Sequence, residues 1–229
     1  MKITTSNLIR WAGLSAVVGG CLFVGIQPIH PPEILPSFTT STWAIVHYVG
    51  VVMCFLILLG ITGIYARQVK EAGWLGLAGF LLFGLMWFLT AAMQFAEAFI
   101  VPLLATAAPT FVDGFFGIVN GHPIETNLGA LPALYALVGI LYVLSGLLFG
   151  IATLRAGILS RWAAGMFGFG AVSSVAFALL PPALEPLATV PVGLGLAWLG
   201  YALWSERREP GSQRIPARER AQLRPTPVA

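Results

Sequence analysis

Charged residues are scarce in this 229-residue chain. Asp, Glu, Lys and Arg together make up 9% of the sequence, whereas hydrophobic residues make up 58%. A soluble domain has about a quarter of its residues charged. The composition therefore excludes an ordinary soluble globular domain, and it predicts an all-α fold in the form of a polytopic transmembrane helical bundle.

Lysine, histidine and cysteine are also rare, which excludes several classes of membrane protein. The only lysines, Lys2 and Lys70, lie outside the long apolar segments, so a retinal Schiff base has no attachment point. Only one histidine, His47, lies within such a segment, which excludes the paired axial histidines of a membrane cytochrome b. Cys21 and Cys54 form no Cys-x-x-Cys pair, and we expect two free thiols at different depths.

Sequence motifs of other functional classes are missing as well. The chain has no P-loop for a nucleotide-driven pump, no arginine ladder for a voltage sensor and no Ser, His and Asp at one depth for hydrolysis. The net charge of +3 could suggest a nucleic-acid partner. The basic residues are not interleaved with aromatic residues, however, so we expect no nucleic-acid binding.

Six apolar segments are long enough to span a membrane, because a helix needs about 20 residues to cross the hydrocarbon core. They are residues 8–27, 42–65, 73–100, 128–154, 162–180 and 187–204. Together they form one transmembrane domain, residues 1–205. Residues 206–229 are rich in arginine and proline and have little to bury, which predicts a disordered tail.

The positions of the basic residues predict an orientation. All twelve lysines and arginines fall at the beginning of the first segment, in the gaps after the second and fourth, or after the sixth. If the segments alternate in direction, these positions share one side of the membrane. The positive-inside rule makes that side the cytoplasm. We therefore expect a multi-pass protein of the cell inner membrane with both termini in the cytoplasm.

Two ionisable residues lie deep inside the apolar segments, His47 and Glu97. Counting from the gap between the second and third segments puts them about 30 and 35 Å away, near the outer ends of adjacent antiparallel helices. They can therefore touch. Thr90, Gln94 and Glu97 follow i, i+4, i+7 spacing and form a polar stripe, and Tyr135 lies at a similar depth on the fourth segment.

These residues predict an outward-facing polar pocket. Its members are His47, Gln94, Glu97 and Tyr135, with Tyr142 one heptad deeper and His30 or His122 joining from the loops. The pocket could serve as an acid–base pair or a proton-coupled site. A structural hydrogen bond at the helix interface explains the same residues, so both interpretations stay open.

The outer half also collects the side chains that could bind a metal. They are His30, His47, His122, Glu33, Asp113 and Glu125. Their spacing follows no recognised ligand pattern, so no metal site is predicted, and the nature of any cofactor stays open.

The long loop of residues 102–127 is apolar around Asp113, Gly114 and Gly117, with Phe111, Phe115 and Phe116 nearby. Such a pattern is typical of a short interfacial helix or a re-entrant lid. As a lid, the loop would cover the region of His47 and Glu97. As a simple amphipathic connector, it would have no role in a site.

Four stretches resemble a group of small bacterial membrane proteins of unknown function. They are Ser41-Thr-Trp-Ala-Ile-Val-His47, residues 91–105 with Glu97 and Pro102, residues 147–165, and Gly195-Leu-Ala-Trp-Leu-Gly-Tyr-Ala-Leu-Trp204. The resemblance covers nearly the whole chain. It implies a six-helix inner-membrane protein and no particular activity.

Three functions fit this description. The first is binding of a lipid, pigment or small amphiphile in the pocket near His47 and Glu97. The second is a membrane enzyme that uses Glu97 and His47 as acid and base on a lipid-soluble substrate. The third is a subunit that scaffolds a larger membrane complex, or a homo-oligomer, through its glycine-rich faces.

Overall fold

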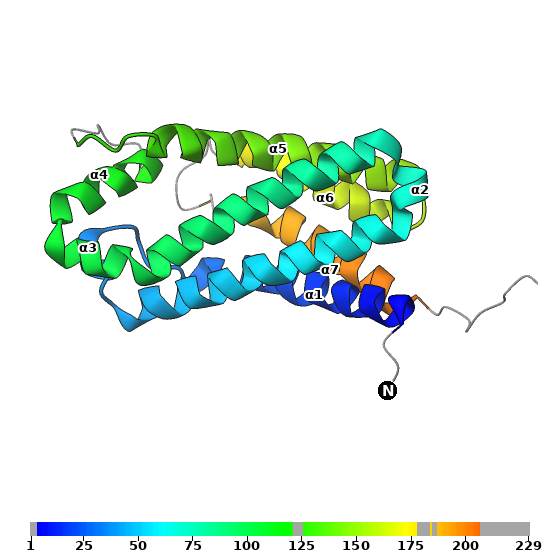
Figure 1. Ribbon diagram of the computed structural model, residues 1–229, viewed down its shortest axis with the longest axis horizontal. Helices are drawn as coiled ribbons and strands as arrows, with labels where there is room; N and C mark the ends of the chain where they lie inside the picture. The colour runs from blue at the N-terminus through cyan, green and yellow to red at the C-terminus, as the bar shows by residue number, and fades with distance from the viewer. Residues whose placement is uncertain (1–3, 121–125, 178–183, 185–186, 207–229) are drawn as a thin grey trace, which may run out of the picture.

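The computed structural model describes residues 4–120, 126–177, 184 and 187–206 (Figure 1). Within these ranges the chain is helical and has no strand. Two single 3-10 turns, η1 (Gln27–Ile29) and η2 (Leu35–Ser37), join the first two helices. The α-helices are α1 (Thr5–Gly25), α2 (Ser41–Phe99), α3 (Val101–Ala107), α4 (Pro109–Asn120), α5 (Leu131–Ala156), α6 (Arg161–Phe177) and α7 (Thr189–Ser205).

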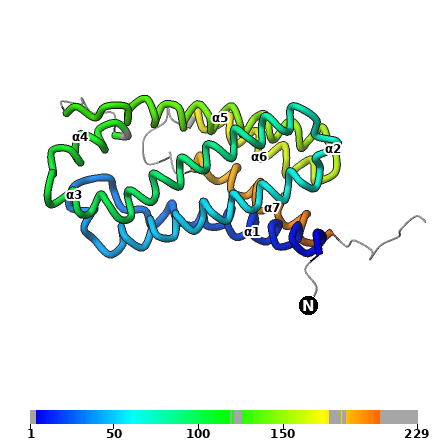
Figure 2. The backbone as a smooth tube through the Cα atoms, in the orientation of Figure 1, coloured from blue at the N-terminus to red at the C-terminus, as the bar shows by residue number. Residues whose placement is uncertain are grey.

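Helix α2 folds back on itself and supplies two of the predicted segments. Its backbone leaves the helical region at Gln68 and Gly73, and Gly73 has φ 58° and ψ −159°. Only glycine adopts that combination readily, because it has no Cβ to clash. The two arms of α2 therefore run antiparallel, as the tube in Figure 2 shows.

The helices pack in a closed ring around an apolar core. The first arm of α2 lies on α1, the second arm lies on α5, and α5, α6, α7 and α1 follow in turn. Glycines permit several of these contacts. A Cβ on Gly79 would lie 2.6 Å from the backbone nitrogen of Phe149, and one on Gly13 would lie 2.8 Å from the carbonyl oxygen of Gly200. Such close backbone approach is how apolar helices associate in lipid.

Three helical stretches are long and apolar enough to cross a membrane, judged by length and composition. They are Thr5–Ile29, Ser41–Phe99 and Leu131–Ala156. Helices α6 and α7 each have 17 residues. The end of the predicted fifth segment, residues 178–180, and all of the predicted tail except Glu206 lie outside the described residues.

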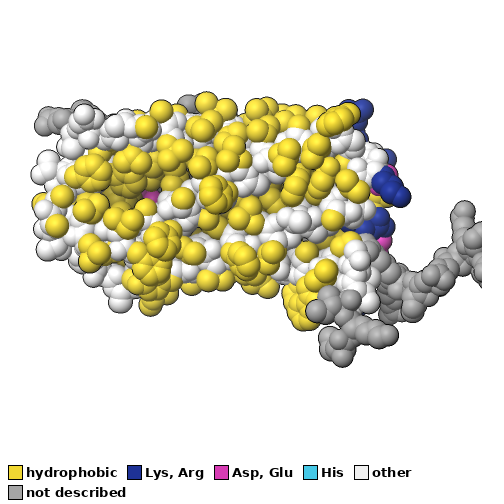
Figure 3. Space-filling model, viewed as in Figure 1, with side chains coloured by type: hydrophobic (Ala, Val, Ile, Leu, Met, Phe, Trp, Pro, Cys, Tyr) yellow, Lys and Arg dark blue, Asp and Glu magenta, His cyan; other side chains and the backbone are white. Residues whose placement is uncertain are grey.

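The basic side chains of the described residues gather at one end of the bundle, called the basic end below. They are Arg10, Arg67, Lys70, Arg155 and Arg161. In Figure 3, the dark blue of lysine and arginine side chains is seen only at that end of the visible face. The rest of that face is largely apolar. The start of α1 and the end of α7 lie together there, since Arg10 Nε donates to the Trp204 carbonyl at 3.2 Å.

Exposed tryptophans accompany the basic side chains. Trp11, Trp74, Trp162 and Trp204 are exposed and lie beside Arg10, the α2 turn, Arg161 and the end of α7. Tryptophan with arginine at one level of an apolar bundle is typical of a membrane–water interface.

The opposite end is covered by α3 and α4, which occupy most of the loop predicted to be an interfacial helix or lid. Val112 and Phe116 of α4 are buried in a second apolar cluster with Phe38 and Trp43. The ring of Phe116 stacks on that of Phe38 at 4.3 Å. Helix α4 is therefore packed onto the end of α2, and the remainder of the loop, residues 121–125, lies outside the described residues.

Candidate functional site

The two arms of α2 bring His47 and Glu97 into direct contact at the end opposite the basic residues. His47 Nε2 lies 3.2 Å from Glu97 Oε2. The side chain of His47 is 1% exposed and that of Glu97 is 12% exposed. Both helix arms start from the turn at Gln68–Gly73, so helix lengths that differ by only about one turn place the two residues at a similar level.

The hydrogen bonds of His47 determine which of its ring nitrogens faces Glu97. Its Nδ1 lies 2.8 Å from the Trp43 carbonyl oxygen, which can only accept, so Nδ1 must donate. Nε2 of a neutral ring is then an acceptor and faces a carboxylate oxygen. A stable contact needs one proton between them, either on the imidazole or on the carboxyl group. The donor of this contact is therefore either the imidazole or the carboxyl group.

Glu97 is also the acceptor for two other side chains. Tyr135 of α5 donates its hydroxyl to Glu97 Oε1 at 3.3 Å, and Gln94 donates its amide to Oε2 at 3.2 Å. The structure thus brings together His47, Gln94, Glu97 and Tyr135, all four from the predicted pocket. We call these four residues the Glu97 cluster.

The side-chain amide oxygen of Gln94 is the one polar side-chain atom of the Glu97 cluster that lacks a hydrogen-bond partner among the described residues. This atom, Oε1, is buried. It lies against Gly50 on the other arm of α2, where a Cβ would come within 1.9 Å of it. Any side chain at position 50 would therefore force the Gln94 amide to move.

Trp43 is a part of the site that the sequence interpretation missed. Its indole donates to the backbone carbonyl of Glu97 at 2.8 Å, and its ring stacks on that of His47 at 4.0 Å. The signal was present, because residues four apart lie on one face of a helix. Trp43 joins the two arms of α2 and holds the imidazole plane against Glu97.

His30 also joins the cluster, from the loop between α1 and α2. Its ring lies 5.2 Å from the ring of His47, and its Nδ1 bonds the Pro31 carbonyl at 2.9 Å. Burial and the nearby charge of His47 lower the pKa of His30, against weaker raising effects of the Pro31 carbonyl and Glu97. The other loop candidate, His122, lies outside the described residues.

An apolar cavity borders the cluster. It has a volume of about 230 Å³ and includes Tyr135, so we call it the Tyr135 cavity. Helices α2, α3, α4 and α5 supply its walls: Leu89, Ala92, Met93, Ala96, Ile100, Val101, Leu104, Phe111, Val112, Phe115, Leu131, Leu134 and Tyr135. Its one polar group is the phenol that donates to Glu97, so the cavity is apolar with a polar edge.

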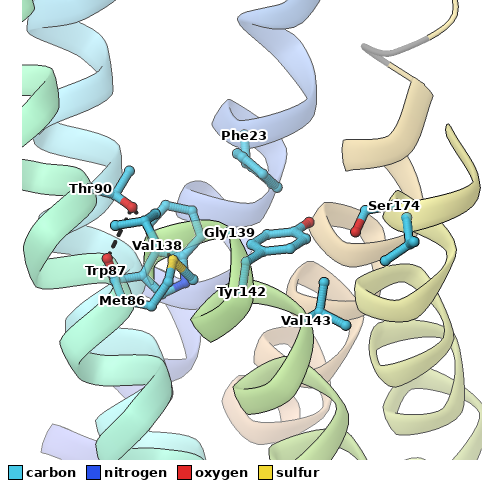
Figure 4. Close-up of a pocket in the computed structure, with 10 residues that line it drawn as sticks. Phe23, Met86, Trp87, Thr90, Val138, Gly139, Tyr142, Val143 and Ser174 are labelled. Carbon is cyan, nitrogen blue, oxygen red and sulfur yellow. Dashed lines mark hydrogen bonds between the residues drawn. The ribbon is translucent and has the colours of Figure 1, made fainter. Parts of the chain in front are cut away.

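Tyr142, predicted to belong to the same pocket, lines a separate cavity nearer the basic end. This Tyr142 cavity measures about 460 Å³ and lies between α1, α2, α5 and α6 (Figure 4). Its lining consists of Phe23, Met86, Trp87, Thr90, Val138, Gly139, Tyr142, Val143, Ser174 and Val175. Seven residues along α5 separate the two tyrosines by about 10 Å. Thr90 of the predicted polar stripe lines this cavity and donates to the Met86 carbonyl.

The described residues contain no group of three or more His, Cys, Asp or Glu side chains that could hold a metal ion. Two of the histidine and carboxylate candidates, His122 and Glu125, lie outside them. Asp113 is exposed on α4. Cys21 is an exposed free thiol and Cys54 a buried one.

No protein-family model, no curated protein and no solved structure matches this chain. The resemblance to small bacterial membrane proteins therefore stays a prediction.

Proposed function

We propose that the protein binds a lipid, pigment or other small amphiphile in the Tyr135 cavity, with its polar group at the Glu97 cluster. The observation that carries this proposal is the cavity's composition, with apolar walls and one phenol that is already hydrogen-bonded to a carboxylate. A cavity of about 150 Å³ is enough for benzene. The Tyr135 cavity therefore suits one ring or a short stretch of chain.

The setting we propose is the bacterial inner membrane, with six spans and both termini in the cytoplasm. The basic end with its exposed tryptophans supports this orientation, and the apolar sides of the bundle support insertion. The Glu97 cluster would then face the outer leaflet. Homo-oligomers or membrane-complex partners remain compatible with this arrangement.

Cysteine labelling in intact cells tests the orientation. In a background without Cys21 and Cys54, Thr39→Cys should react with a membrane-impermeant maleimide and Lys70→Cys should react only after permeabilisation. Both positions are exposed, so the protein itself hinders neither reaction. Labelling of Lys70→Cys in intact cells would overturn the orientation.

Ligand recovery tests the binding function. Protein purified in mild detergent should carry a lipid-soluble molecule that organic extraction and mass spectrometry detect. Ala96→Leu narrows the Tyr135 cavity and should lower its amount, whereas Ala136→Leu, an exposed α5 position outside the cavity, should not. Equal recovery from both variants would refute binding at this cavity.

A second candidate function is acid–base catalysis on a lipid-soluble substrate, and the direct contact of His47 with Glu97 favours it. Both ring nitrogens of His47 are already engaged, so Glu97 would meet the substrate and His47 would hold or supply its proton. Glu97→Gln should then abolish turnover in a protein that still folds. A fully active Glu97→Gln variant would exclude this mechanism.

The scaffolding function has weaker support. The glycine-rich helix faces that it would need already pack against other helices of the same chain. Gly60 lies on Ala16, Gly150 on Gly168 and Gly195 on Phe167. Purification as a stable monomer without partners would count against scaffolding and leave the binding proposal intact.

A further inference from the structure

The Tyr142 cavity is the larger of the two cavities described above and lies apart from the Glu97 cluster. Neither His47 nor Glu97 lines it, and no residue of its lining is charged. A charged ligand would therefore enter it without a counter-charge, which is costly in an apolar site. The cavity suits a neutral molecule.

The hydroxyl groups in the lining differ in what they can still bind. Thr90 donates to the Met86 carbonyl, and Ser174 donates to the Ala171 carbonyl at 2.7 Å. The Tyr142 hydroxyl forms no hydrogen bond with any described residue. Figure 4 shows that it points across the cavity toward Ser174, so the phenol is a donor directed into the cavity.

The size and opening of the cavity fit an elongated apolar group. Its volume of about 460 Å³ is roughly three times that of a cavity that holds benzene. Gly139 has open space where a Cβ would stand, and Val175 is 53% exposed. The cavity is thus open beside these two residues, on the α5 and α6 side.

We propose that the Tyr142 cavity is a second binding site, which accepts a neutral lipophilic molecule through a carbonyl oxygen hydrogen-bonded to the Tyr142 hydroxyl. An acyl ester of a lipid and a quinone both present this chemistry. Ser174 and Thr90 offer oxygen lone pairs to any donor the ligand has. This site goes beyond the Tyr135 cavity, because it uses other side chains and needs no proton on His47 or Glu97.

Quenching of tryptophan fluorescence provides the measurement, since Trp87 lines the cavity. A bromine atom quenches an indole that it contacts. A brominated fatty acyl methyl ester and a brominated alkane of equal length are titrated into purified protein, with a short-chain benzoquinone as a second carbonyl probe. Trp87→Phe should remove most of the quenching, which places the probe in the cavity.

The tyrosine is tested by comparing the two brominated probes. The wild-type protein should bind the ester about 2- to 10-fold more tightly than the alkane, the gain expected of one hydrogen bond. Tyr142→Phe should bind both equally. Equal affinities in the wild type, or an ester preference that survives in Tyr142→Phe, would overturn the proposal. Quenching by the benzoquinone alone would assign the site to quinones, and quenching by the ester alone to acyl lipids.

A pair of glycine variants tests where the probes bind while Tyr142 stays unchanged. Gly139→Leu fills the cavity and should weaken binding of both probes at least 10-fold. Gly84→Leu adds the same side chain at another open helix position, outside the lining, and should bind as the wild type does. Unchanged binding in Gly139→Leu would overturn the proposal even if Tyr142→Phe fails to fold. Glu97→Gln should not alter binding here, so failure of the Tyr135 site and failure of this one are distinguishable.

Discussion

Glu97 is the common acceptor of its cluster, so its removal should cost more stability than any other change at the site. Glu97→Ala leaves the Tyr135 hydroxyl, the Gln94 amide and His47 Nε2 without their partner. A buried polar group without a partner costs about 1–3 kcal/mol, and three groups lose their partner here. Because these losses overlap, we expect a total of about 3–5 kcal/mol, which corresponds to a fall in Tm of roughly 10 °C.

Glu97→Gln separates hydrogen bonding from charge. The amide keeps the shape of the side chain, accepts from Tyr135 and donates to His47 Nε2. Gln94 then faces an NH2 group, and a rotation of its own amide presents the unpartnered Oε1 instead. We therefore expect a loss of about 1 kcal/mol, the value of an ordinary neutral hydrogen bond.

The buried thiol of Cys54 provides the assay. Cys54 is 0% exposed, whereas Cys21 is exposed. In a Cys21→Ser background, a thiol-reactive fluorogenic dye therefore reports unfolding of the α2 core during a thermal ramp in detergent. A Tm of Glu97→Ala within about 2 °C of the parent would refute the cluster as a stabilising unit. A Glu97→Gln variant as unstable as Glu97→Ala would show that charge, and not hydrogen bonding, holds it together.

Two further predictions concern the α2 turn and the loop histidine. Gly73→Ala should lose about 1–3 kcal/mol, because φ of 58° with ψ of −159° is strained for any residue with a Cβ, whereas Gly84→Ala should gain about 0.5–1 kcal/mol in an ordinary helix interior. The folded protein holds the pKa of His30 below its usual value, so the unfolded chain binds the proton more strongly and stability falls as the pH drops below the unfolded pKa of about 6.5. His30→Gln should reduce the loss of Tm between pH 7.5 and 5.5. His47 and Glu97 are the titratable groups that act on His30, and they remain in both proteins.

The same dye assay decides both predictions. Equal effects of alanine at positions 73 and 84 would show that the backbone at position 73 tolerates a Cβ. An unchanged pH profile in His30→Gln would show that His30 does not carry the acid sensitivity.

Helical periodicity explains why much of the candidate site was predictable. His47 and Glu97 belong to helices that share a short turn, so a count of residues fixes their relative height, and the 3.2 Å contact agrees with it. The same count placed Tyr135 level with them, and it donates to Glu97. Trp43 was predictable in the same way, as the residue one turn before His47, but its role required knowing that its indole points toward the second arm of α2.

Residues in irregular segments and cavity walls were not predictable. His30 follows a 3-10 turn and two prolines succeed it, so no periodicity fixes the direction of its ring. Tyr142 shares a helical face with Tyr135, yet helix packing places it in a second cavity. The two tyrosines lie at different levels along α5, and the helices packed at each level close a different cavity.

Composition and the order of the charged residues are enough to predict an apolar helical protein with its basic residues at one end. Both signals can be read segment by segment, because hydrophobic length and the position of basic residues do not depend on contacts between distant parts of the chain. Helix packing adds three features: His47 and Glu97 lie 3.2 Å apart, α4 packs against Phe38 and Trp43, and two separate cavities lie along α5. Those features depend on rotations of packed helices by a fraction of a turn, which an almost uniformly apolar sequence leaves open.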